Sequence, residues 1–283
     1  MEAYLKQLRE IRERGVWKEQ RAVLACGTRP RILSLFGMQA RYNLQNGFPI
    51  VTTKRVSFKL VAEELIWFLS GSTNNKDLQS RGCTIWDEWA DPVTGELGPI
   101  YGQQWRRWRY WTAEGQPAEW DQIRTLVHQL QQRVADPTAP CGRRLILTAW
   151  NPPEMPLTRG PSACHTLAQF DVTEDRLSCQ MYQRSADMFL GVPFNLASYA
   201  LLTHLLARSV GLQVGELIHT IGDAHLYENH LPQVEEQLTR TPRPLPTLWL
   251  DPAVRDIDEF TSSAQAKLIG YDPWPALKGE VAI

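Results

Sequence analysis

The sequence predicts an α/β fold of the α+β type, formed by a single domain that spans residues 1–283. Two kinds of segment alternate along the chain, and their patterns support this prediction. Apolar residues recur at helical spacing in 3–14, 60–69, 121–134 and 195–210. Strand-like apolar runs occupy 32–36 and 145–151. No internal repeat, low-complexity tract or linker divides the chain, and 43% hydrophobic residues suffice for one core.

The predicted elements have recognisable ends. The first helix should end at Gly15, the second at Ser70-Gly71 and the fourth at Gly211. Residues 21–31 are typical of a loop that leads into the first strand. Residues 105–111 alternate arginine with aromatic residues, and we expect a surface loop there. Such a pattern can also stack on single-stranded nucleic acid, which stays a minor alternative.

Composition excludes several classes of function. A net charge of -1 argues against bulk electrostatic binding of nucleic acid or anionic membranes. The 5 cysteines are scattered without CxxC spacing, which indicates reduced thiols and makes a zinc site unexpected. The N-terminus has no apolar signal core, and no apolar run is long enough to span a membrane. We therefore expect a cytoplasmic protein.

One stretch, Pro161–Asn195, gathers the groups needed to attack and orient a phosphorylated heterocycle. Cys164 is a candidate nucleophile, because a nearby cation increases the fraction of a thiol that is thiolate. Arg184 can supply that cation if Cys164 opens one strand of a hairpin and Arg184 ends the other. Asp187 and Asn195 add a carboxylate and an amide.

Each of these residues also has a plainer interpretation. A lone cysteine in an apolar strand is usually a small buried hydrophobe, and a lone arginine is usually a surface residue. Asn195 could simply cap the helix that follows. Glu64 would normally face water. However, helical spacing places Glu64 on one face with Val61 and Phe68, so we expect it to point inward, where an unused carboxylate is costly.

Long phrases of this stretch resemble the folate-dependent thymidylate synthase family. They are Cys164-His165, Gln183-Arg184-Ser185-Ala186-Asp187 and Gly191-Val192-Pro193-Phe194-Asn195. The similarity extends from Gly37-Met38-Gln39 to Val281-Ala282-Ile283, nearly the whole chain. It implies one large, mixed and kinked β-sheet flanked by helices, with the sheet forming the interface of a homodimer.

The resemblance also implies a role for each site residue. Cys164 would be the nucleophile, and Glu64 and Tyr101 would move protons through ordered water. Asn195 would bind uracil, whose N3–H and O4 match its acceptor and donor, and His225 and Tyr227 would bind ribose. The phosphate would be held by Arg21, Arg184, Ser185 and, across the dimer interface, the partner's Arg143 and Arg144. Folate would contact Ile85, Trp86, Trp89, Asp187, Leu190, Gly191, Phe194 and the tail residue Ala282.

Two departures from the family's usual wording affect the nucleotide site. A longer, unrelated loop follows Arg21, so Arg29 or Arg31 could close on the phosphate in its place. Pro161-Ser162-Ala163 precedes Cys164, where the family usually has proline directly before the cysteine. The second departure could shift the loop beside the thiol.

The reaction implied is reductive methylation of dUMP to dTMP by 5,10-methylenetetrahydrofolate. Folate would then be a consumed co-substrate, and no metal, flavin or nicotinamide is expected; no glycine-rich dinucleotide fingerprint is present. One alternative is a pyrimidine deoxynucleotide hydroxymethylase, in which water replaces hydride. A less favoured alternative is a non-enzymatic RNA-binding relative.

Overall fold

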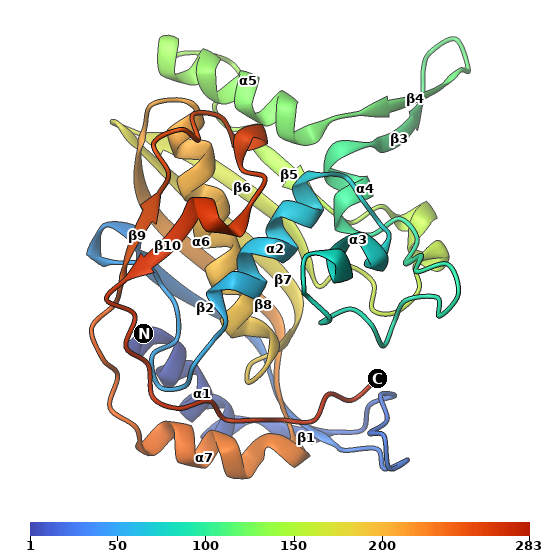
Figure 1. Cartoon of the computed structure of the whole chain (residues 1–283), viewed down its shortest axis with the longest axis vertical. Coiled ribbons are helices and arrows are strands. Elements are labelled where there is room, and N and C mark those ends of the chain that lie inside the picture. Colours follow the sequence, from blue (N-terminus) through green and yellow to red (C-terminus); the bar gives the residue numbers. More distant parts are fainter.

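The computed structural model describes residues 1–283, with helices and strands in alternation (Figure 1). The helices are α1 (Glu2–Arg14), α2 (Phe58–Leu69), α3 (Asn75–Ser80), α4 (Tyr101–Arg106), α5 (Gln122–Ala135), α6 (Gly191–Ser209) and α7 (Leu231–Thr239). The strands are β1 (Val16–Lys18), β2 (Ile32–Asn43), β3 (Trp108–Trp111), β4 (Pro117–Trp120), β5 (Ile146–Thr148), β6 (His165–Thr173), β7 (Arg176–Asp187), β8 (Gln213–Tyr227), β9 (Thr247–Leu250) and β10 (Ala266–Ile269).

Six strands form one mixed sheet in the order β1-β2-β8-β7-β6-β5. All pairs are antiparallel except β7 with β8, which run parallel because α6 crosses between them. The register shifts between Leu177 and Cys179, and again between His165 and Leu167. Such irregularities bend a sheet locally. The predicted mixed sheet flanked by helices is confirmed.

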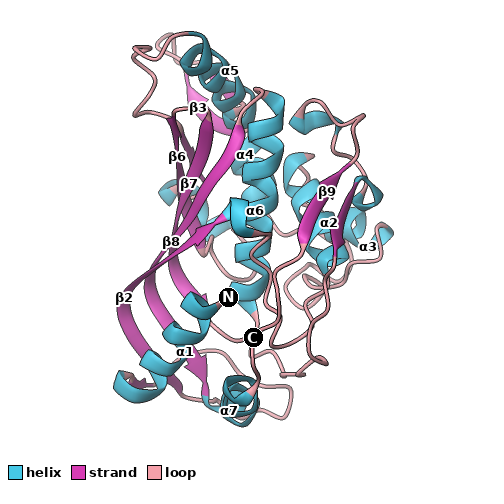
Figure 2. Ribbon diagram, turned by 90° about the vertical axis from the view of Figure 1, so that its left-hand side faces the viewer, coloured by secondary structure: helices cyan, strands magenta, loops and turns pink.

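The core lies between one face of this sheet and α6, and α2 packs on the far side of α6; Figure 2 shows α6 beside the strands and α2 farther from the sheet. A single cluster of 63 buried residues fills this space. α6 is apolar around most of its circumference, which is typical of a helix enclosed on all sides. α2 is almost wholly buried as well, with Trp67 and Phe68 at its centre.

The helices predicted from apolar periodicity form close to where expected, although α6 begins at Gly191 rather than at 195, and two of them start with a side-chain cap. Ser57 accepts a hydrogen bond from the backbone N–H of Leu60 and begins α2, and Asp121 does the same for Arg124 at the start of α5. The buried face of α5 is the predicted one, Ile123, Leu126, Val127 and Leu130. Gly211, with φ +74°, follows α6.

Three predictions about local structure are wrong. Residues 105–111 are not a loop: α4 ends at Arg106, and β3 forms a two-stranded hairpin with β4 that projects from the body (Figure 1). The first long strand does not stop at Phe36. It continues through Gly37, whose φ is +82°, to Asn43, and residues 38–43 alternate between buried and exposed. The run 145–151 is shorter than predicted and gives only Ile146–Thr148.

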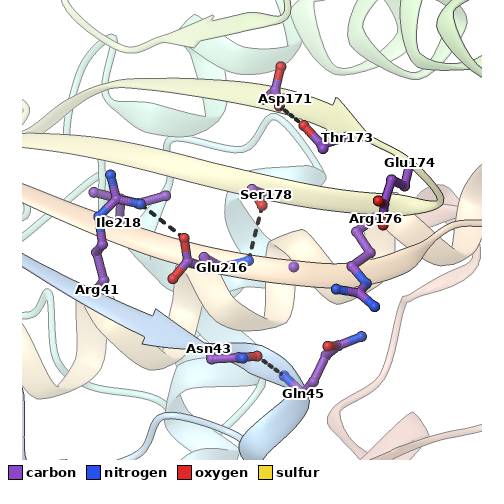
Figure 3. A pocket seen from close by; sticks show the side chains of 11 residues that line it. Arg41, Asn43, Gln45, Asp171, Thr173, Glu174, Arg176, Ser178, Glu216 and Ile218 are labelled. Carbon is purple, nitrogen blue, oxygen red and sulfur yellow. Dashed lines mark hydrogen bonds and ion pairs between the residues drawn. The ribbon is translucent and has the colours of Figure 1, made fainter. Parts of the chain in front are cut away.

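The other face of the sheet carries a row of polar side chains. Gln39 and Gln180, from β2 and β7, both donate to the hydroxyl of Thr220 on β8. Nearer the end of the strands lies an open depression of about 520 Å³, in which Arg41 pairs with Glu216 at 2.9 Å (Figure 3). Only 1 of its 11 lining residues is hydrophobic. No helix in the chain combines the length and apolarity needed to cross a membrane.

Candidate active site

The β6–β7 hairpin brings Cys164 and Arg184 together as the sequence predicts. The backbone N–H of Arg184 donates to the carbonyl of Cys164 at 2.8 Å. The side chain then returns over the loop before β6, and its Nη2 lies 4.0 Å from Cys164 Sγ. Arg184 also donates to the carbonyls of Ser162, at 2.7 Å, and Ala163, at 2.9 Å. These contacts use only the backbone of the unusual lead-in, so its altered side chains do not displace the guanidinium.

The thiol is not activated by Arg184 alone. Burial raises the pKa of Cys164, and the charge of Asp187 raises it further, whereas Arg184 lowers it. The net direction is upward, because burial outweighs the attraction of the guanidinium. The attraction of Arg184 therefore does not by itself yield a thiolate in the unliganded chain. Formation of the thiolate needs a further positive charge or a proton acceptor.

Tyr101 and Glu64 form the wall of the site opposite the sheet. Tyr101 opens α4, and its hydroxyl oxygen accepts the backbone N–H of Cys164 at 2.7 Å. Burial raises the pKa of Tyr101 well above its usual value, so the group is a neutral phenol. Glu64 faces inward, as expected, and its Oε1 accepts the indole N–H of Trp86 at 2.7 Å. Burial raises the pKa of Glu64 to about 7, although the Trp86 hydrogen bond opposes the shift.

Asn195 does not cap α6, which begins earlier, at Gly191. Its Oδ1 accepts a hydrogen bond from Gln183 Nε2 at 3.0 Å. Gln183 is buried and in turn meets His219 Nε2 through its own Oε1 at 2.9 Å. Burial lowers the pKa of His219 to about 3, so the neutral ring must carry its hydrogen on Nε2 to donate to Gln183. The chain from His219 to Gln183 therefore fixes which way the Asn195 amide points.

Sequence reasoning missed the roles of Gln183 and His165. Gln183 lies in the quoted phrase with Arg184, but its partner His219 is 36 residues away. His165 stacks on the Tyr101 ring with centroids 4.0 Å apart, and its Nδ1 lies 2.9 Å from the hydroxyl of Tyr199. No local pattern signals either contact. His165 thus holds the phenol of Tyr101 in place over Cys164.

The ends of β7 and β8 carry the remaining polar residues side by side. Strand register pairs Ser185 with Asp223 and Asp187 with His225. Asp187 Oδ1 accepts the backbone N–H groups of Phe189 and Leu190, which fixes the turn into α6. The rings of His225 and Tyr227 face the same side and lie 5.4 Å apart, as predicted for residues two apart on a strand.

The predicted folate residues sit at the margin of the core. Trp86 is buried, and its ring lies 5.7 Å from that of Trp89. Four others are partly exposed but pack against the core: Ile85, Trp89, Leu190 and Phe194. A half-exposed apolar margin of this kind fits a flat ring such as a pterin, because the ring would cover it. Gly191 lies in the first turn of α6.

The tail that contains Ala282 is held by the loop that replaces the family's usual phosphate loop. Val23 and Ile283 exchange two backbone hydrogen bonds, at 2.7 and 2.9 Å. The backbone N–H of Ala25 donates to the carboxylate of Glu280 at 3.0 Å. The backbone carbonyl oxygen of the same Glu280 lies 2.8 Å from His230 Nε2. Two segments far apart in the sequence therefore close one side of the site.

The candidate phosphate arginines differ in how they are engaged. Arg31 pairs with Glu228 at 2.8 Å and lies over the Trp17 ring. Arg21 is exposed and forms no ion pair within the chain, yet its charge acts on Tyr227. Arg143 and Arg144 lie on the turn before β5, are both exposed and form no ion pair either. The chain alone does not bring this last pair to Arg184 through any contact.

A half-buried thiol beneath a guanidinium, with a neutral phenol bonded to its backbone N–H, is an arrangement typical of enzymes that work through a sulfur nucleophile. The model of the thymidylate synthase family matches residues 2–283. The chain therefore belongs to the thymidylate synthase family, whose members are methyltransferases that act on dUMP with methylenetetrahydrofolate.

Proposed function

We propose that the protein converts dUMP to dTMP, with 5,10-methylenetetrahydrofolate as donor of both carbon and hydride, and that residues 1–283 act as one catalytic domain in the cytoplasm. The observation that carries this proposal is the position of Cys164 between Arg184 and Tyr101. Its Sγ lies 4.0 Å from the guanidinium, and its N–H donates to the phenol.

In the proposed first step, the Cys164 thiolate adds to C6 of the uracil ring and a C–S bond forms. The electron pair of the C5–C6 double bond moves toward O4, so that C5 becomes nucleophilic. Because burial raises the pKa of Cys164, the thiol needs help to lose its proton. The arginines recruited with the phosphate would supply further positive charge beside the sulfur.

The bound folate supplies a one-carbon electrophile and, later, a hydride. After C5 has attacked that carbon, loss of the C5 proton breaks the bond to the folate nitrogen and leaves an exocyclic methylene. Hydride addition to this methylene then gives the methyl group, restores the C5–C6 double bond and expels the Cys164 sulfur as thiolate. Glu64 suits a proton acceptor acting through water, because a carboxyl group with a pKa of about 7 is present in both forms near neutrality. Tyr101 remains a neutral phenol that donates to water or substrate.

Asn195, His225 and Tyr227 would set the choice of nucleotide. The Asn195 amide, oriented by Gln183, can accept from the uracil N3–H and donate to O4. Cytosine presents the opposite pattern at these atoms, so a buried mismatch would cost about 1–3 kcal/mol. His225 and Tyr227 face the same side of β8, where one ribose hydroxyl can meet both.

Arg21 is the favoured closing arginine for the phosphate. Burial raises the pKa of Tyr227 to about 12, and among the smaller contributions the charge of Arg21 lowers it, which supports Arg21 as the arginine near the proposed ribose site. Arg31 is already engaged by Glu228 and Trp17. Arg29 forms no ion pair, but nothing in the chain orients it toward the site.

A homodimer that joins the polar outer faces of two sheets would complete the phosphate site. Along β7, Arg184 shares its parity with Gln180 and Tyr182, so it belongs to the outer face at the end of the strand. Exposed, unpaired Arg143 and Arg144 are therefore suited to reach the partner's site across this interface. Two planar guanidinium groups match a phosphate dianion well.

The variant Cys164→Ser tests this proposal. A hydroxyl is a far weaker nucleophile than a thiol here, so turnover of dUMP should fall by about a thousandfold or more. Formation of dihydrofolate, followed by its absorbance, measures turnover. Cys26→Ser, which changes an exposed thiol on the loop at 21–31, should retain full activity. Near-native turnover by Cys164→Ser would refute the proposed mechanism.

The product distinguishes the hydroxymethylase alternative. That reaction would give tetrahydrofolate and a nucleotide heavier than dTMP, with no rise in absorbance from dihydrofolate. Mass spectrometry of the nucleotide therefore decides between hydride and water as the final nucleophile. The apolar rings of Trp86 and Trp89 support hydride transfer, since with folate and the tail they would shield the site from water.

A further inference from the structure

Beside the ribose side of the site lies a network of charged and polar groups that the proposed mechanism does not use. Asp223 on β8 lies at its centre. Its Oδ2 accepts from Lys18 Nζ at 2.9 Å, and its Oδ1 accepts from the hydroxyl of Ser34 at 2.9 Å. Lys18 also donates to Ser34 Oγ at 2.9 Å, which closes a triangle between β1, β2 and β8.

The same carboxylate reaches His225. Asp223 Oδ1 lies 3.1 Å from His225 Nδ1, and the backbone carbonyl of Asp223 lies 3.3 Å from the same nitrogen. Both are oxygen acceptors, so Nδ1 must carry the hydrogen. His225 is only 5% exposed, which leaves its ring little room to turn.

The carboxylate is held in its charged form. Burial alone would raise the pKa of Asp223, but the hydrogen bonds from His225, Lys18 and Ser34 together lower it far below its usual value. An ionised Asp223 can only accept hydrogen bonds, so it cannot support a ring with its hydrogen on Nε2 alone. The strand register keeps Ser34, which binds Asp223, beside His225, because Ser34 and His225 pair directly across β2 and β8.

We propose that Asp223, anchored by Lys18 and Ser34, is a positioning residue that fixes the tautomer of His225, so that His225 Nε2 accepts a hydrogen bond from a ribose hydroxyl. This rests on the proposed function, in which His225 and Tyr227 bind the ribose of dUMP. A hydroxyl can donate to His225 Nε2 while it accepts from the phenol of Tyr227. A ribose position without a donor cannot satisfy the lone pair on Nε2.

The site should therefore discriminate against a nucleotide that lacks the 3′-hydroxyl. We expect wild-type protein to bind dUMP on the order of tenfold more tightly than 2′,3′-dideoxyuridine monophosphate, as measured by calorimetry. In Asp223→Asn the amide can donate to Nδ1 and favours the other tautomer. The ratio of the two affinities should then fall to about one to two, because mainly the binding of dUMP weakens.

Matched variants separate positioning from general stability. Lys18→Met and Ser34→Ala remove one anchor each, keep the carboxylate and should reduce the ratio only in part; they carry the test if Asp223→Asn does not fold. Asp272→Asn, which removes an exposed carboxylate paired with Arg243, should leave the ratio unchanged. The proposal would be overturned if the ratio of the two affinities stayed unchanged in all three variants Asp223→Asn, Lys18→Met and Ser34→Ala, including the case in which the binding of both nucleotides weakens equally.

A spectroscopic readout keeps this inference distinct from the proposed function. Nitrogen-15 NMR of the histidine side chains should show His225 with its hydrogen on Nδ1, the signal being assigned by its loss in His225→Gln. A hydrogen on Nε2 alone would refute the tautomer whatever the protein binds. Failure of wild-type protein to bind dUMP, with the Nδ1 tautomer present, would instead refute the proposed function and the ribose contact while Asp223 still positions the ring.

Discussion

Glu64 shows how burial sets the chemistry of one residue. The carboxyl group is buried beside the Trp86 indole, and its pKa rises from 4.5 to about 7 mainly because the charged form loses its hydration. The folded protein thus holds this proton more tightly than the unfolded chain does. The associated stabilisation is complete below pH 4.5 and is lost as the pH rises toward and through 7.

This shift predicts a pH-dependent effect of Glu64→Gln on stability. Glutamine stays neutral and can still accept the Trp86 hydrogen bond, so the variant avoids the cost of a buried charge. Its free energy of unfolding, relative to wild type, should increase by on the order of 3 kcal/mol between pH 5 and pH 8. Urea denaturation at both values measures this change. Turnover should fall at the same time, because the proton acceptor is gone.

A control locates the effect at the buried site. Glu119→Gln removes an exposed carboxylate on β4 and should shift stability little at either pH. A Glu64→Gln variant whose relative stability does not change between the two pH values would show that Glu64 is already well solvated or paired in the folded state.

In the loop before Cys164, the backbone of Gly160 packs closely against the side chain of Trp89. Its φ of +78° suits glycine, and a Cβ built on it would lie 2.6 Å from Trp89 Cβ and 2.7 Å from Trp89 Cγ. Trp89 is one of the half-exposed residues proposed to contact folate. The position of that ring therefore depends on the absence of a side chain at residue 160.

Gly160→Ala should consequently affect the two substrates differently. The added methyl group would push Trp89 aside, so the KM for methylenetetrahydrofolate should rise several-fold while the Kd for dUMP stays near its wild-type value. Gly115→Ala, in the turn between β3 and β4, gives a similar backbone penalty at φ +73° without any neighbour within 4 Å. Steady-state kinetics of both variants would test this; equal effects would contradict the role given to Trp89.

At the scale of helices and strands, the sequence predicts helices better than strands. α1, α2, α5 and α6 contain long runs of apolar residues at helical spacing, so local pattern suffices to predict them. The β3–β4 hairpin is mostly exposed and lacks an apolar alternation, and its strands therefore leave no pattern. The strand predicted at 32–36 ends too early, because Gly37, which has a positive φ, interrupts the strand pattern of β2 in the sequence.

The site follows the same division. Groups that carry chemistry, such as Cys164 and Glu64, are recognisable by residue type and pattern. The groups that orient Asn195 and His225 are not, because Gln183, His219 and Asp223 depend on contacts between elements that the sequence does not reveal. Nor does the sequence reveal that burial outweighs Arg184 in setting the pKa of Cys164, since burial depends on the complete fold.

For the whole molecule, the proposed dimer predicts that two inactive variants restore each other. Cys164→Ser lacks the nucleophile, and the double variant Arg143→Ala/Arg144→Ala lacks the arginines lent to its partner. A mixed dimer would hold one site with both, so reassociation of equal amounts should return about a quarter of wild-type activity. Activity measured after mixing, unfolding and refolding tests this prediction. No recovery, with dimers present by sedimentation, would show that each chain uses its own arginines.

The crossover through α6 has a consequence for how the molecule assembles. The residues proposed to attack the nucleotide and to bind its uracil and ribose all derive from one unbroken stretch, residues 164–227, whose central strands pair in parallel. Parallel strands cannot be joined by a tight turn, so the crossover segment that contains α6 must be present before β7 and β8 can pair. Because Asp187, Leu190 and Phe194 lie in the same stretch, pairing of β7 with β8 would bring together residues proposed for both the nucleotide and the folate.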